Sequence, residues 1–148
     1  YLFATPGKTI DYQMIRATIR ESAERFKVVD ISFDRWGANQ LTQELTSDRF
    51  TMVEMGQGFA SMASPTKEFL RLIVEGKLLH GGHPVLAWMA DHAGGEMNPA
   101  GDVKLAKQRS TTRIDGLVAA VMALDGLKRR GSIKRRSVYA DRGLEVLA

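Results

Sequence analysis

Apolar residues along this chain repeat at helical intervals in some segments and form short continuous runs in others. Ile15, Ile19 and Phe26 lie on one side of a predicted helix that begins at the capping residue Asp11. The run from 28 to 33 is typical of a strand buried on both faces. This alternation of segments predicts a layered α/β domain.

The same pattern predicts the remaining elements. A helix is expected to begin at Ser64 or Pro65, because proline is favoured in the first turn. Turn residues Asn98–Asp102 between two short segments, 94–97 and 103–105, predict a β-hairpin. We further expect a strand end at 1–4, helices at 38–45, 64–74, 85–92 and 112–129, a strand at 50–55 and an extended piece at 78–79.

Asp115 stands at the start of an otherwise apolar helical segment, 114–124. A helix this apolar is predicted to be buried, and a buried carboxylate is costly unless it is paired or binds a metal. Two interpretations remain open for Asp115: a metal ligand, or the acid of a capping box that reaches back to Thr112. The neighbouring Gly116 indicates that a backbone or a ligand comes near.

Asp34 directly follows the predicted strand 28–33. Carboxylates at the C-terminal edge of a strand and at the start of a helix lie where α/β folds build their sites. Asp34 could instead cap the next helix or form a turn, as Asp often does. If Asp34 and Asp115 faced each other, they would suit a divalent cation, which prefers oxygen ligands.

Charge is unevenly distributed along the 148 residues, whose formal net charge is +4. Residues 1–100 carry ten basic and twelve acidic side chains, whereas residues 101–136 carry ten basic and three acidic ones. Such a basic segment favours nucleic acid or another anionic partner. A solvated basic tail is the alternative.

Several chemistries lack their sequence signals. The chain has no cysteine, so it has no disulfide and no thiolate site. His80, His83 and His92 lack the HExxH spacing of a zinc site, and we expect them on loops or the surface. No GxxxxGK[ST] or GxSxG motif occurs, which argues against an ATP site in this chain and against a serine hydrolase. No apolar run is long enough to span a membrane.

Several motifs in order resemble the nuclease domain of the large terminase subunit of tailed bacteriophages. The resemblance covers nearly the whole chain. It rests on Ala4-Thr5-Pro6-Gly7, Ile10-Asp11-Tyr12, Phe33-Asp34-Arg35-Trp36, Gln57-Gly58-Phe59-Ala60-Ser61-Met62, Pro65-Thr66-Lys67-Glu68, Gly76-Lys77-Leu78-Leu79-His80-Gly81-Gly82, Pro84-Val85-Leu86, Lys107, Ser110 and Arg113-Ile114-Asp115-Gly116.

This resemblance implies an RNase H-like mixed sheet flanked by helices, and metal-dependent cutting of concatemeric viral DNA. Asp34 and Asp115 resemble two of the acids that bind Mg²⁺ or Mn²⁺, so both are expected to be catalytic and to bind metal, with two ions in the complete site. The family's first acid lies on a first strand upstream of Tyr1, so we expect this chain to lack that strand and to hold only part of the site. Residues 1–130 would form the nuclease domain, the C-terminal part of the full protein, and 131–148 a basic tail.

The resemblance also implies partners. Double-stranded DNA is the expected substrate, with Lys104, Lys107, Arg109 and Arg113 as candidates for contacts to its backbone; a solvated loop is the alternative for these residues. The phage portal and the small terminase subunit are implied as protein partners, and the cytoplasm of a bacterial host as the location of this phage or prophage protein. Competing hypotheses are a non-catalytic RNase H-like module that binds DNA or the portal, and a resolvase- or integrase-like nuclease.

Overall fold

The first helix lies where the sequence predicts it. The computed structural model describes residues 9–34 and 39–131; the expected strand at 1–4 and the basic tail from 132 onward lie outside the described residues. Helix α1 (Tyr12–Arg25) begins after Asp11, whose carboxylate accepts hydrogen bonds from the backbone N–H groups of Gln13 and Met14. The predicted cap at Asp11 is therefore confirmed.

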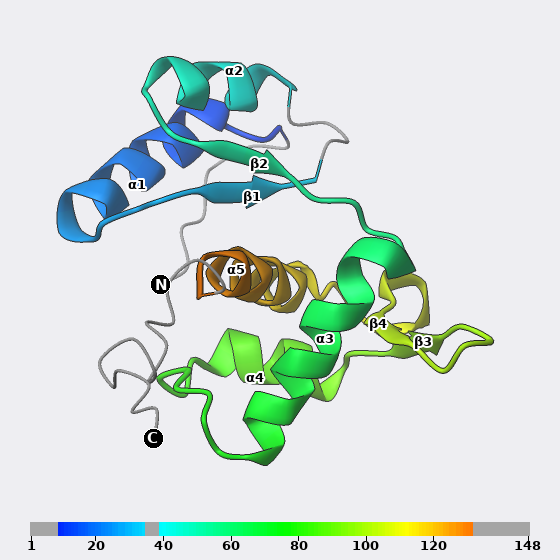
Figure 1. Cartoon of the computed structure of the whole chain (residues 1–148). Helices are drawn as coiled ribbons and strands as arrows, with labels where there is room; N and C mark the ends of the chain where they lie inside the picture. The colour runs from blue at the N-terminus through cyan, green and yellow to red at the C-terminus, as the bar shows by residue number, and fades with distance from the viewer. Residues whose placement is uncertain (1–8, 35–38, 132–148) are drawn as a thin grey trace, which may run out of the picture.

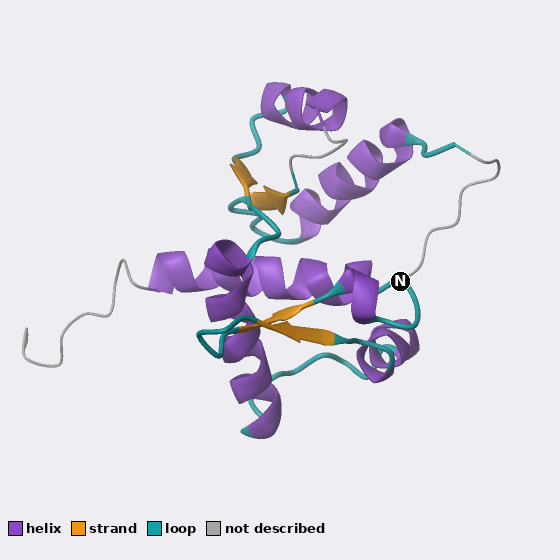
Figure 2. Cartoon of the chain, turned by 90° about the vertical axis from the view of Figure 1, so that its right-hand side faces the viewer, coloured by secondary structure: helices purple, strands orange, loops and turns teal. Residues whose placement is uncertain are grey.

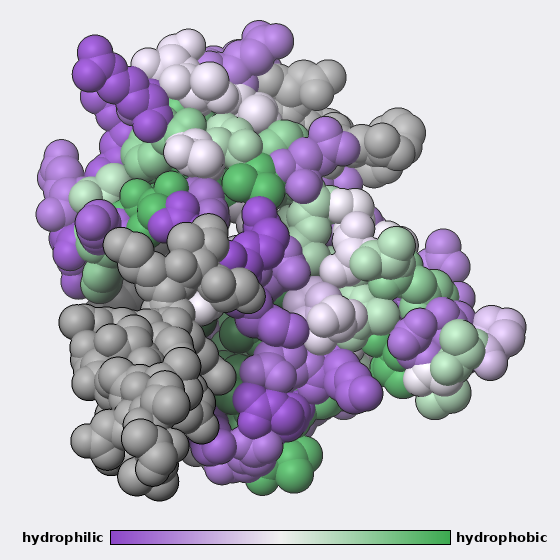
Figure 3. Space-filling model, viewed as in Figure 1, coloured by the Kyte–Doolittle hydropathy of each residue, from purple (hydrophilic) through white to green (hydrophobic). Residues whose placement is uncertain are grey.

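The two strands that follow form a parallel pair. Strand β1 (Ile31–Phe33) and strand β2 (Met52–Glu54) are aligned with Ser32 opposite Val53, and helix α2 (Asn39–Ser47) lies between them in the sequence. Both strands are shorter than predicted. Side chains of β1 are half-buried, and apolar residues gather over the two strands on the face shown in Figure 3.

Helix α3 (Phe59–Val74) begins earlier than the sequence predicts. The predicted start at Ser64 or Pro65 is wrong, because Gly58 caps the helix and Pro65 lies in its interior. Four residues spaced as one helical face, Met62, Pro65, Thr66 and Phe69, are buried. Packing of this continuous face offsets the backbone hydrogen bond that the proline removes.

A helix and a hairpin follow α3. Helix α4 (Pro84–Asp91) has proline in its first turn, as predicted, and the ring of His83 accepts a hydrogen bond from the Val85 N–H. The predicted hairpin is confirmed: β3 (Gly95–Met97) pairs antiparallel with β4 (Val103–Leu105). The extended piece predicted at 78–79 is not a strand; Leu78 packs on the core and Leu79 is exposed.

The last helix, α5 (Asp115–Gly131), begins three residues later than predicted, after the short 3₁₀ helix η1 (Lys107–Arg109). Residues before it bond to the hairpin region instead: the Ser110 hydroxyl accepts from the Gly94 N–H, and the Thr111 N–H donates to the His92 carbonyl. Because the helix begins at Asp115, Thr112 is not its cap, and the capping-box interpretation of Asp115 is wrong.

The described elements pack around α5. Figures 1 and 2 show α1, α2, β1 and β2 on one side of this helix and α3, α4 and the hairpin on the other. The main core lies on the second side and joins Met55, Met62 and Phe69 to a buried face of α5, namely Ile114, Leu117, Val118, Val121 and Met122. The described strands form two two-stranded sheets, one parallel and one antiparallel, in the α/β arrangement that the sequence predicts.

Candidate functional site

Oppositely charged side chains line one cavity of about 500 Å³. Asp34 follows β1, Glu96 lies on β3, Lys104 lies on β4, and Lys107 and Arg109 belong to η1. Val118 of α5 forms another part of the wall. The cavity therefore brings Asp34 together with three of the four predicted DNA-binding residues.

The packing of α5 against β1 places Asp34 and Asp115 at the same end of the molecule. At the far end, the Arg130 guanidinium contacts the Asp30 carboxylate at 3.1 Å, and Gly126 lies against Asp30. Four strand residues from Asp30 to Asp34 span about 13 Å. Eight helical residues from Gly126 back to Val118 span about 12 Å, which matches the shared cavity of Asp34 and Val118.

Asp115 lies about one helical turn beyond Val118, at the start of α5. In Figure 1, β1 points towards the side of the molecule where α5 begins. The fold thus places two acids that are far apart in the sequence at the same end of the β1–α5 packing. No feature of their spacing in the sequence predicts this; the resemblance does.

Asp115 is exposed, not buried as the apolar helix predicts. Its side chain is 61% exposed, and its carboxylate is bound by the Lys107 ammonium at 2.5 Å. Because Lys107 also lines the cavity, this ion pair connects Asp115 to the wall that contains Asp34. Gly116 is close to the sulfur of Met89 on α4, so a neighbouring side chain accounts for this glycine.

Lys104 is held more firmly than Lys107. Its side chain is only 17% exposed, its ammonium lies 3.1 Å from the Glu96 carboxylate on the paired strand, and it stands 5.1 Å from the centre of the Phe59 ring. The ion pair and the aromatic ring together restrict the position of the Lys104 ammonium. Glu96 is a site residue that the sequence analysis missed; the cross-strand register of the predicted hairpin could have indicated it.

The remaining predicted cations differ in position. Arg109 is exposed and lines the cavity, whereas Arg113 is exposed in the segment just before α5 and is not part of the cavity wall. Arg109 is also close to the hairpin: its carbonyl oxygen lies 2.4 Å from the position that a Cβ on Gly94 would occupy. This close approach requires glycine and fixes η1 against the start of β3.

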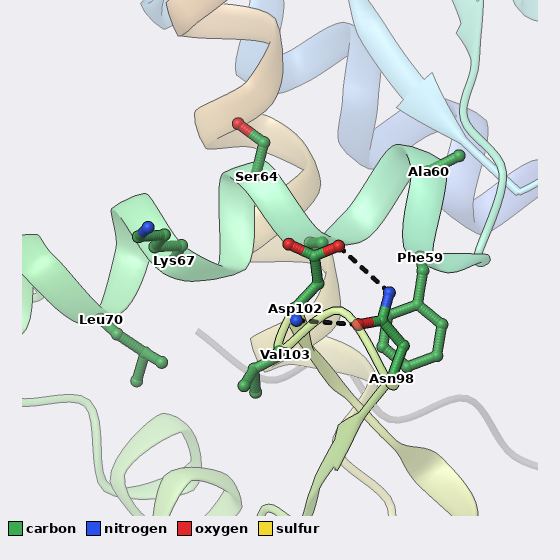
Figure 4. Close-up of a pocket in the computed structure, with 10 residues that line it drawn as sticks. Phe59, Ala60, Ser64, Lys67, Leu70, Asn98, Asp102 and Val103 are labelled. Atoms are coloured by element: carbon green, nitrogen blue, oxygen red, sulfur yellow. Dashed lines mark hydrogen bonds between the residues drawn. The ribbon is translucent and has the colours of Figure 1, made fainter.

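A larger cavity, of about 720 Å³, lies between α3 and the hairpin turn. Figure 4 shows Ser64 and Lys67 on one wall and Asn98 and Asp102 on the other. The Asp102 carboxylate accepts a hydrogen bond from the Asn98 amide at 3.1 Å, which stabilises the turn. This cavity contains neither predicted acid, so its size does not make it the better candidate.

The described residues contain no cluster of three or more His, Asp or Glu side chains that could hold a metal. The histidines serve locally: His83 caps α4, and the His92 ring packs on Trp88. Two carboxylates with water and substrate phosphates are a common Mg²⁺ site, because this ion retains several waters. Asp34 and Asp115 carry the type of oxygen ligand that such a site uses, and a second ion would require further oxygen ligands.

Comparison with known proteins identifies the family. The family model for the terminase large subunit, endonuclease domain, matches residues 3–130. The large terminase subunit of Enterobacteria phage HK97 is 36% identical over 125 residues, covering 83% of this chain and 25% of that protein. Protein YmfN of Escherichia coli strain K12 is 30% identical over 125 residues, covering 83% of this chain and 28% of that protein.

A solved structure agrees with these relatives. The crystal structure of the HK97 bacteriophage large terminase matches with a TM-score of 0.75 at 35% identity, covering 82% of this chain and 26% of that chain. The chain therefore belongs to the terminase large subunit family and corresponds to its endonuclease domain. It spans about a quarter of the length of these relatives. Within the described residues, no helix is long and apolar enough to cross a membrane.

Proposed function

We propose that this chain is the metal-dependent endonuclease domain of a DNA-packaging terminase, with an RNase H-like fold, and that its complete protein cuts concatemeric viral DNA. The observation that carries the proposal is the placement of Asp34 and Asp115 at one end of the β1–α5 packing, beside a cavity lined by Lys104, Lys107 and Arg109. Membership of the family supports the choice of reaction. Residues 131–148 would add a basic tail to this domain.

Asp34 and Asp115 would bind Mg²⁺ or Mn²⁺ through their carboxylate oxygens. A pair of such ions, when bound, activates water and stabilises the leaving oxygen in phosphodiester hydrolysis. The side chains of this domain would bind the DNA. Backbone phosphates would be held at the cavity by Lys104, Lys107 and Arg109, and outside its wall by Arg113. Because phosphate contacts carry no base information, cutting would depend little on the DNA sequence.

Double-stranded DNA is the proposed substrate, and the portal and small terminase subunit are the proposed protein partners. The proposed location is the cytoplasm of a bacterial host, where a phage or prophage would produce the protein. A second function, DNA binding without cutting, is favoured by one observation. The Lys107 ammonium binds the Asp115 carboxylate, which would otherwise be available to a metal ion. Metal affinity separates the two functions, because a pure binding module has no need of Mn²⁺.

The decisive experiment compares two acid-to-amide variants with a control on the same helix. Asp34→Asn and Asp115→Asn in the complete protein should each reduce cutting of linear duplex DNA in Mn²⁺ by at least about 100-fold, because each removes a charged metal ligand. Asp125→Asn, whose carboxylate pairs with Arg129 near the other end of α5, should retain the wild-type rate. Wild-type cutting by either of the first two variants, with folding verified by circular dichroism, would contradict the proposal.

A further inference from the structure

The charges of the described residues around the cavity balance without a metal ion. Among these residues, three cations stand against three acids, because the Asp115 carboxylate joins the wall through Lys107. A divalent cation added to this site would make it strongly positive unless a lysine moved. The six charged residues are Asp34, Glu96, Asp115, Lys104, Lys107 and Arg109.

The two lysines differ in how easily they could move. Lys104 is largely buried and is restrained by both Glu96 and the Phe59 ring. Lys107 is 55% exposed, and its ammonium contacts the exposed Asp115 carboxylate. An exposed ion pair of this kind changes the affinity of its partners only about 1.4- to 5-fold, so another cation can replace it readily.

We propose that Lys107 exchanges partners: it neutralises Asp115 in the metal-free protein and moves to a DNA phosphate when a divalent cation binds that carboxylate. Lys107 both lines the cavity and contacts Asp115, so a rotation of its flexible side chain suffices for the exchange. Lys104 stays in place in both states. This proposal rests on the proposed function, since it requires Asp115 to bind metal. It couples metal loading to DNA binding through one side chain.

The first test measures the Mn²⁺ affinity of the complete protein by isothermal titration calorimetry. Lys107→Met keeps the apolar stem and removes the competing ammonium, so Mn²⁺ should bind about 1.4- to 5-fold more tightly than to the wild type. Lys104→Met is the matched control, because it removes a cation of the same cavity that pairs with Glu96 instead of Asp115. Its effect on Mn²⁺ affinity should be smaller.

The second test needs no metal. In EDTA, the affinity for a fluorescent duplex is measured by anisotropy over a range of salt concentrations. Asp115→Asn releases Lys107, so the slope of log affinity against log salt should steepen by about 0.9, the value of one added phosphate contact. In the Lys107→Met background, the same Asp115→Asn change removes one negative charge but frees no lysine. The slope should then stay unchanged.

The outcomes separate this proposal from the proposed function. Equal Mn²⁺ affinity of the wild type and Lys107→Met, or the same change of slope in both backgrounds, overturns the exchange and leaves the nuclease assignment intact. Absence of Mn²⁺ binding in every variant, or of DNA binding by the wild type at low salt, overturns the proposed function and the exchange with it. Tighter Mn²⁺ binding together with a Lys107-dependent slope supports both.

Discussion

At the start of α5, a fully buried residue is followed directly by an exposed one. Ile114 is 0% exposed and belongs to the core, whereas the adjacent Asp115 is exposed and bound by Lys107. The sequence predicts the burial of the apolar residues of this segment correctly, and it wrongly extends that burial to Asp115. Asp115 lies off the buried face that Leu117, Val118 and Val121 form, and apolar composition alone does not reveal which positions of a helix face solvent.

Ile114 should therefore fix the position of Asp115 by packing. Ile114→Val removes one buried methylene and should lower the free energy of unfolding by about 1 kcal/mol. The same change at Ile73, which is 48% exposed on α3, should cost less than about 0.5 kcal/mol. Urea denaturation monitored by circular dichroism measures both values. Equal costs for the two variants would show that the Ile114 site relaxes around the smaller side chain.

Elements with strong local signals could be predicted from the sequence, and those set by distant contacts could not. Asp11 and Pro84 mark the starts of α1 and α4, and the turn at 98–102 defines the hairpin. The early start of α3 depends on a buried face that packs against α5, and the late start of α5 depends on hydrogen bonds of 110–111 to the hairpin region. Neither contact is visible in local sequence.

The junction of η1 and β3 provides a test at the level of elements. A Cβ at Gly94 would lie 2.4 Å from the Arg109 carbonyl oxygen, a backbone atom that cannot turn aside. Gly94→Ala should therefore lower the free energy of unfolding by about 3 kcal/mol, at the upper end for overpacking. Gly95→Ala, where the nearest atom is at an ordinary 3.5 Å, should change it by less than about 0.5 kcal/mol. Thermal unfolding of the two variants measures the contrast; similar midpoints would contradict this close approach.

The contact between α1 and α2 predicts a pH dependence. Two hydrogen bonds from the Arg16 guanidinium, both 2.7 Å, lower the pKa of the Asp48 carboxyl below its usual 3.8. A carboxylate with a lowered pKa stabilises the folded state fully above that usual value, and the contribution is lost as the pH falls through the folded pKa. Asp48→Asn should thus lower Tm at pH 7, and the difference from wild type should shrink as the pH falls from 3.8 towards 2.

The control for this pH dependence is Asp91→Asn, on the exposed end of α4. Its Tm should follow that of the wild type at both pH values, because the substitution does not touch the contact between α1 and α2. A constant difference in Tm for Asp48→Asn from pH 7 to pH 2 would show that the variant loses packing rather than the ion pair.

Over the whole molecule, α5 is the element that relates the two candidate acids. It carries Asp115 and packs against β1, which leads to Asp34. Sequence spacing cannot predict this relation, because residues 81 positions apart in the sequence reach the same end of the molecule only through tertiary packing. The resemblance to terminases supplied the pair, and the antiparallel course of β1 and α5 gives it a physical basis. Gly126, against Asp30, allows the close approach.

Filling the space at Gly126 should disturb the site without touching either acid. A Cβ there would lie 3.1 Å from Asp30 Oδ1, and the larger side chain of Gly126→Leu would force β1 away from α5. We expect a loss of about 1–3 kcal/mol in the free energy of unfolding. Because Asp34 would move relative to Asp115, Mn²⁺ affinity should also fall. Ala119→Leu, at an exposed position of the same helix, should alter neither quantity. If Gly126→Leu were destabilised but bound Mn²⁺ as tightly as the wild type, the spacing of β1 and α5 would have no part in the site, and Asp34 and Asp115 would not share an ion.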